Sequence, residues 1–199
     1  MGNARTIWHH EVNQADTIAR GLLKAGSADF GWKILLDPSR FIAYLRSKRD
    51  LAEKRKNILF TKKLAFGAAK EIYRGNDRAH EMGLIVMKTR KRLDKDKKGT
   101  YTEKVRRRQM NEIEWLMDHY LRLLNSTGET FEENLRGAYS TKNKYLSYLN
   151  RLHKLEQEVR RASLGLPKNG RKKIRPSDFG KTQVVYEKIR NTEAKSIFK

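Results

Sequence analysis

Residues 37–73 read DPSRFIAYLRSKRDLAEKRKNILFTKKLAFGAAKEIY, and this stretch decides the fold. Asp37 followed by Pro38 is typical of a helix start, because the carboxylate caps free N–H groups and proline fits the first helical position. Pairs of apolar residues then recur every seven residues as far as Ile72-Tyr73. This spacing predicts one long helix with a single apolar stripe. Its other faces are expected to carry the cations Arg46, Lys48, Arg49, Lys54, Arg55, Lys56, Lys62 and Lys63.

Helical periodicity extends to both sides of this stretch. The chain has no proline between positions 39 and 166, and this absence permits long helices there. Apolar residues on one helical face predict further helices over 11–25, from 77 towards 99, from 100 to 124 and from 130 to 164. The fold class is therefore predicted to be all-α, with about five helices packed as long antiparallel helical hairpins in a coiled-coil-like manner.

The last predicted helix carries the clearest packing pattern. Apolar residues follow a 4,3 spacing from Phe131 to Val159, which is typical of helix-on-helix packing. Lys142 and Glu156 interrupt the stripe, which favours an antiparallel partner within the chain over a dimeric coiled coil. A capping-box spacing precedes the last two predicted helices, at Thr100 with Glu103 and at Thr130 with Glu133.

Proline and glycine divide the chain into three predicted parts. Residues 1–36 form an N-terminal helix and loop, 37–166 an elongated helical domain, and 167–199 a basic C-terminal arm. The arm holds Pro, Gly, Lys and Arg with little to bury, so it is predicted to be extended. Within it, residues 181–194 are expected to form a short helix or strand that docks on a partner.

The charge of the chain limits the class of partner. Its 199 residues include 45 basic and 23 acidic ones, which gives a net charge of +22. Such a chain repels itself unless a polyanion neutralises it. The chain has no cysteine, which excludes disulfides, thiol catalysis and cysteine zinc sites. It fits a cytoplasmic compartment or the inside of a particle.

The positive charge gathers in two blocks. Residues 88–108 carry a net charge of +8 and residues 160–199 carry +9, whereas residues 1–37 are neutral. If the helices on either side of Gly99 pack antiparallel, their basic ends meet at one tip. Arginine at a helix N-terminus opposes the helix dipole, and a function in phosphate binding would explain that cost.

These two blocks supply the candidate nucleic-acid-binding residues. Long helices favour contact with the phosphate backbone over the reading of base edges. Tyr101, Phe179 and Tyr186 lie in or near the blocks, where they are expected to anchor the chain or to stack on bases. The candidates are Arg90, Lys91, Arg92, Lys95, Lys97, Lys98, Lys104, Arg106, Arg107 and Arg108 at the junction, and Lys168, Arg171, Lys172, Lys173 and Arg175 in the arm.

No catalytic or metal motif is complete in this sequence. Gly180-Lys181-Thr182 resembles the end of a phosphate-binding loop, but Arg175 stands where that motif needs glycine. The histidines lack the spacing of metal ligands, and His119 and His153 are expected at the surface or half-buried. The sequence therefore predicts no cofactor, no metal and no enzyme. Three nearby acids are expected to neutralise neighbouring basic helices: Glu112, Glu114 and Asp118.

The N-terminal residues MGNART fit the pattern for myristoylation at Gly2. A single lipid needs a basic patch to hold a membrane, and the first 37 residues are neutral, so a membrane partner is not favoured. No apolar run reaches the roughly 18 residues that a membrane span needs. The basic run 168–175 also matches a nuclear localisation signal, so the nucleus is an alternative compartment.

The favoured function is that of a non-enzymatic structural protein in a large nucleoprotein assembly. This covers a ribonucleoprotein subunit and an internal or connector protein of a virion, with DNA or RNA and other protein subunits as partners. Two alternatives remain. One is a membrane-associated, matrix-like helical protein with an N-terminal lipid, and the other is a helical scaffold that binds acidic proteins.

Overall fold

The computed structural model describes residues 2–24, 38–97, 99, 101–163 and 176–198. Within them the chain forms helices and no strands, so the prediction of an all-α fold is confirmed. The helices number seven in this part of the chain rather than about five. They are α1 (Gly2–Lys24), α2 (Pro38–Tyr73), α3 (Arg78–Lys95), α4 (Glu103–Leu124), α5 (Phe131–Tyr139), α6 (Lys142–Ser163) and α7 (Pro176–Ile197).

The first additional helix arises from a break in the predicted helix over 130–164. Ser140 has a φ of 58°, a left-handed conformation that ends α5, and its N–H donates to the carbonyl of Arg136 at 2.7 Å. The apolar stripe crosses the break, since Leu135 and Tyr145 are both buried. Periodicity alone therefore could not reveal the interruption.

The second additional helix corrects the prediction of an extended C-terminal arm. Pro176 to Ile197 form α7, which begins with proline at its first position. Ala194 and Ile197 are buried in the main core, so this helix docks on its own chain. The preceding stretch, 164–175, lies outside the described residues.

Side-chain caps fix the helix starts. Asp77 accepts from the N–H of His80 at 2.9 Å, and Thr130 forms the predicted capping box with Glu133. At α4 the prediction of the cap was wrong. Thr102 is the N-cap and accepts from the N–H of Val105 at 3.4 Å, whereas Thr100 lies outside the described residues.

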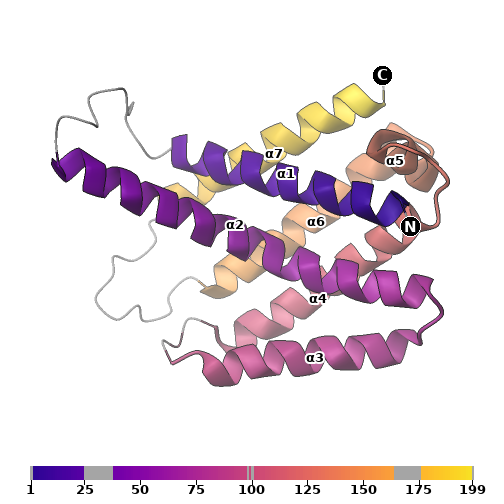
Figure 1. Ribbon diagram of the computed structural model, residues 1–199, viewed down its shortest axis with the longest axis horizontal. Coiled ribbons are helices and arrows are strands. Elements are labelled where there is room, and N and C mark those ends of the chain that lie inside the picture. Colours follow the sequence, from indigo (N-terminus) through magenta and orange to yellow (C-terminus); the bar gives the residue numbers. More distant parts are fainter. Residues whose placement is uncertain (1, 25–37, 98, 100, 164–175, 199) are drawn as a thin grey trace.

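The core lies where α2, α4 and α6 cross, with α1 and α7 covering one side (Figure 1). Ala65, Ala68 and Ala69 of α2 are buried, and these small side chains let neighbouring helices approach closely. The apolar residues that predict the helix from 100 to 124 share one face with Gln109, and burial confirms this inner face except at Gln109, which is half-buried. The buried members are Val105, Ile113, Leu116, Met117, Tyr120 and Leu124.

The predicted stripe of α2 is only partly correct. Tyr73 and Ala52 are exposed, whereas Lys62, expected on an outer face, is buried. Coiled-coil-like packing, the antiparallel hairpins and the division into three parts at 36 and 166 stay predictions.

Candidate nucleic-acid interface

The predicted basic junction lies at the end of α3 and the start of α4. Arg90, Lys91, Arg92 and Lys95 belong to the last turns of α3, and Lys97 follows that helix. The first turns of α4 contribute the other described candidates, Lys104, Arg106, Arg107 and Arg108. The remaining candidates, Lys98, Lys168, Arg171, Lys172, Lys173 and Arg175, lie outside the described residues.

The structure brings the two helix ends together. Asp96, the C-cap of α3, accepts a hydrogen bond from the N–H of Tyr101. Across the junction, a guanidinium nitrogen of Arg90 lies 4.0 Å from a carboxylate oxygen of Glu103. The two runs of cations therefore belong to one surface.

Glu103 organises the arginines at the start of α4. Arg106 donates to both of its carboxylate oxygens, through Nε at 2.8 Å and Nη2 at 2.7 Å, and Arg107 donates through Nε at 3.1 Å. The hydrogen bonds from Arg106 lower the pKa of Glu103 to about 2, so the carboxylate stays charged. A negative charge in the first turn also offsets the cost that arginines impose on the helix dipole.

Arg92 is half-buried and packs against two aromatic rings. Its guanidinium carbon lies 3.8 Å from the centroid of the Phe60 ring and 4.7 Å from that of Tyr101. Tyr101 is itself buried, so it anchors the junction and cannot stack on a base in this arrangement. Arg92 therefore has a structural role, and the prediction that it contacts phosphate finds no support in its position.

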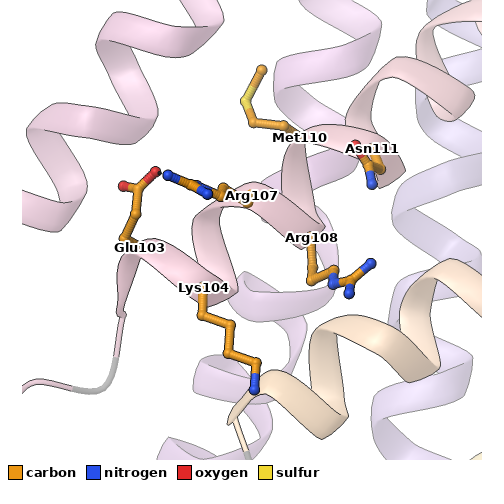
Figure 2. Close-up of a pocket in the computed structure, with 6 residues that line it drawn as sticks. All are labelled: Glu103, Lys104, Arg107, Arg108, Met110 and Asn111. Atoms are coloured by element: carbon orange, nitrogen blue, oxygen red, sulfur yellow. Dashed lines mark hydrogen bonds and ion pairs between the residues drawn. The ribbon is translucent and has the colours of Figure 1, made fainter.

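Three of the remaining cations, Lys104, Arg107 and Arg108, line an open hollow of about 690 Å³ on α4 (Figure 2). Arg107 is 77% exposed although it touches Glu103, and Arg108 reaches Glu158 of α6 at 2.8 Å. Lys91, Lys95, Lys97 and Lys104 are exposed and have no ion-pair partner within the described part of the chain. The hollow is lined by Glu103, Lys104, Arg107, Arg108, Met110 and Asn111.

Sequence reasoning missed a second group of charges, which is buried in the core. Lys62 of α2 forms an ion pair with Glu11 of α1, and Arg190 of α7 pairs with Glu156 of α6. The void beside these groups is about 10 Å³, room for one water molecule at most. The buried charges therefore hold helices together and do not form an open site.

The acids of α4 follow the prediction in two of three cases. Asp118 and Glu114 neutralise Arg78 of α3, at 2.6 Å and 3.6 Å. Glu112 is instead buried, and its Oε1 accepts from the hydroxyl of Thr61 at 2.7 Å. Burial, followed by the nearby Glu156 carboxylate, raises the pKa of Glu112 to about 7.

Glu112→Gln should stabilise the protein at alkaline pH. Its carboxyl has a pKa of about 7 when folded against 4.5 in the reference state, so the folded form binds more protons between these values. The contribution of protonated Glu112 to the free energy of unfolding is fully present below pH 4.5 and is lost as the pH rises to 7. We expect the variant to gain on the order of 2 kcal/mol over the native chain at pH 8 and nothing at pH 4.5.

Urea unfolding of both chains at matched pH measures this difference. Comparison at the same pH cancels the titration of other groups, including buried His119. Glu114→Gln is the control, since that side chain is exposed on the same helix. An equal gain for Glu112→Gln at both pH values would contradict the assignment.

The histidines differ from expectation. His119 and His153 are buried rather than on the surface, and burial lowers the pKa of His119 to about 3. Nδ1 of His119 lies 2.7 Å from the hydroxyl of Tyr139. His10 lies 2.6 Å from Glu193. Among the described residues, no group of three or more acids and histidines could hold a metal ion.

Comparisons of the chain with protein-family models, with curated proteins and with solved structures gave no match. Across the described ranges, each helix is too short or too polar to cross a membrane.

Proposed function

We propose that this chain is a non-enzymatic structural protein of a nucleoprotein assembly, which grips the phosphate backbone of DNA or RNA at the α3–α4 junction. One observation carries the proposal. Exposed Lys91, Lys95, Lys97 and Lys104 have no ion-pair partner among the described residues; Lys104 lines the hollow beside Arg107, and the other three lie at the end of α3 that meets the start of α4. Unpaired cations on a chain with a net charge of +22 favour a polyanion.

The geometry of the junction suits phosphate groups better than base edges. The positive end of the α4 dipole lies under Lys104 and Arg107, and it adds to the potential of their side chains. Glu103 fixes the guanidinium planes of Arg106 and Arg107, so that they are already ordered before a ligand binds. Arg106 donates both Nε and Nη2 to Glu103, whereas Arg107 donates only Nε, so the exposed Nη groups of Arg107 remain to donate to the oxygens of a phosphate. No exposed aromatic ring is found beside the hollow in the described part of the junction, so stacking is not expected to contribute.

The double variant Lys104→Glu/Arg107→Glu should weaken binding to all nucleic acids and reduce its dependence on salt. Each phosphate contact contributes about −0.9 to the slope of log K against log salt on duplex DNA, so losing two contacts should flatten the slope by about 2. Titrations between roughly 50 and 200 mM salt, with duplex DNA, single strands and structured RNA, measure the slope.

A matched control lies on the same helix. Arg122 is exposed in the last turn of α4, about 27 Å from Lys104 at the helical rise per residue. Arg122→Glu changes the net charge by about half as much as the double variant, and it does so away from the junction, so it should leave the slope nearly intact. Equal losses of nucleic-acid affinity in the junction variant and in Arg122→Glu would place the phosphate contact elsewhere. An affinity of the native chain that does not change with salt would refute nucleic-acid binding.

The two alternative functions predict different results, which separate measurements can detect. A membrane-associated matrix protein would bind anionic vesicles in preference to nucleic acid, and an N-terminal lipid would be seen by mass spectrometry. A scaffold for acidic proteins would copurify without nucleic acid, which absorbance before and after nuclease treatment would reveal. We propose a cytoplasmic or particle-internal location, with the nucleus as the alternative.

A further inference from the structure

Helix α3 lies at the edge of the molecule and turns a long face to solvent (Figure 1). Only Glu81, Ile85 and Thr89 of its 18 residues are buried, and they form one narrow stripe. The opposite face holds Val86, which is 43% exposed, and Met87, which is 61% exposed. These are two of the four large apolar side chains that are exposed in the described part of the chain.

The outward face of α3 is defined by its helical positions. At about 100° per residue, Ala79, Gly83, Val86 and Arg90 fall within an arc of roughly 60°, and Met87 lies beside them. A Cβ atom placed on Gly83 would meet nothing within 4 Å, so the face is open at its centre. Ala79 and Gly83 stand four residues apart, and their small size lets another helix approach closely.

Charge surrounds this apolar strip unevenly. Lys88, Arg90 and Lys91 are exposed at its C-terminal end, where Arg90 lies 3.7 Å from Asp94 and 4.0 Å from Glu103. The strip is therefore apolar at one end and cationic at the other. A ligand that fits it needs apolar side chains and negative charge on one surface.

We infer that the outward face of α3 docks an acidic amphipathic helix of a protein partner. Leucine-type side chains would pack on Val86 and Met87 above the open position at Gly83, and carboxylates would pair with Arg90 and Lys91. Methionine suits such a face because its unbranched side chain adapts to different partners. This face lies on α3, whereas all the residues that line the hollow belong to α4.

Charge distinguishes this occupant from the others. A second copy of the chain would bring another net charge of +22 to a surface that is already cationic. Nucleic acid would satisfy Arg90 and Lys91 but would leave Val86 and Met87 without apolar contacts. An acidic helix satisfies both parts of the face.

A synthetic probe tests the inference on the full chain. The probe is a labelled peptide of about 20 residues with leucines on one helical face and glutamates on the others, long enough to form a stable helix when bound. Its reference is a scrambled peptide of identical composition, which keeps the charge but loses the apolar face. Fluorescence anisotropy at physiological salt measures both affinities. We expect the ordered peptide to bind at least about tenfold more tightly, which corresponds to 1.4 kcal/mol.

Two variants locate the binding site. Val86→Ser/Met87→Ser should reduce the affinity for the ordered peptide about tenfold without changing the salt slope for duplex DNA. Val184→Ser is the matched control, because Val184 is an equally exposed apolar residue, at 62%, on α7. Equal affinity for the ordered and scrambled peptides would overturn the inference, as would an unchanged affinity in the α3 variant.

The other occupants give results that also overturn it. A dimer in sedimentation that Met87→Glu dissociates would assign the face to a second copy. Binding to anionic vesicles that depends on Val86 and Met87 would assign it to a membrane. Loss of duplex binding in Lys104→Glu/Arg107→Glu bears on the proposed function alone, so the two proposals fail independently.

Discussion

Arg190→Met is expected to lower the free energy of unfolding by about 3–5 kcal/mol, because it leaves a buried carboxylate without its partner. The Arg190 side chain is 1% exposed, and its Nη1 and Nη2 donate to the two oxygens of Glu156 at 2.9 Å and 2.7 Å. Glu112 lies in the same region, so the variant would hold two carboxyls and no paired cation there.

The pH dependence of this loss checks its cause. Burial raises the pKa of Glu156, and the Arg190 guanidinium outweighs it and lowers that pKa below its usual value. Without Arg190 the raising effect of burial is opposed only by the smaller effects of Arg160 and His153, so Glu156 should take up a proton at a higher pH than in the native chain. The loss of stability should therefore be largest above neutral pH and shrink as the pH falls towards 4.5.

Urea unfolding followed by circular dichroism measures the loss, and hydrogen exchange locates it. The amides of α7 should lose protection first, because Arg190 ties this helix to α6. Arg190→Lys keeps the charge but not the two-pronged contact, and it should fall between the native chain and Arg190→Met. Arg190→Met/Glu156→Leu should recover most of the stability. Lys188→Met, exposed on the same helix, should change it by less than about 0.5 kcal/mol.

The helices could be predicted well where a side-chain cap and an apolar face agree. α2 begins at Pro38 as predicted, Asp77 caps α3, and the inner face of α4 is buried as the periodicity indicated. The break at Ser140 was not predicted, and the helix over 176–197 was expected only as a short helix or strand over 181–194. A positive φ at a serine leaves no mark on hydrophobic periodicity, and α7 begins with polar residues that resemble an extended arm.

The sequence positions of the buried cations indicate that they lie on apolar helix faces, but the large number of basic residues made them hard to recognise. Lys62 stands four residues after Ile58 and three before Ala65, so it lies on the apolar stripe of α2. Arg190 stands four residues from both Tyr186 and Ala194 in the same way. In a chain with 45 basic residues, each of them looked like one more surface cation. Their partners could not be predicted, because pairing between distant helices depends on tertiary packing.

At the candidate interface, too, the sequence could not distinguish exposed cations from cations that pack against the protein. The sequence located the basic junction correctly as a segment, but it treated all ten of its cations as equivalent. The structure separates Arg92, held between two rings, from exposed Lys104 and Arg107. Exposure and intramolecular pairing decide which cations can meet a phosphate, and neither can be read from residue types.

Lys62→Met is the second variant with a large expected effect, again about 3–5 kcal/mol of unfolding free energy. The side chains of Lys62 and Glu11 are 5% and 7% exposed, and Nζ donates to Glu11 and also to Oε1 of Gln14 at 3.0 Å. Burial alone would raise the pKa of Glu11, but Lys62 outweighs it and lowers that pKa to about 2. Methionine has a similar shape, so the loss would come from the unpaired carboxylate rather than from a cavity.

The adjacent residue provides the control for Lys62. Lys63→Met removes the same charge from the next position of α2, but Lys63 is exposed, so its loss should stay within about 0.5 kcal/mol. Lys62→Met/Glu11→Gln should restore most of the stability, because it removes the orphaned charge. The Glu11 carboxylate stabilises the native chain above pH 4.5 and loses this effect as the pH falls towards 2. In Lys62→Met the unpaired Glu11 carboxylate destabilises the protein instead, so the loss of unfolding free energy should become smaller in acid, where this carboxylate takes up a proton. Similar losses for Lys62→Met and Lys63→Met would refute a buried ion pair between α1 and α2.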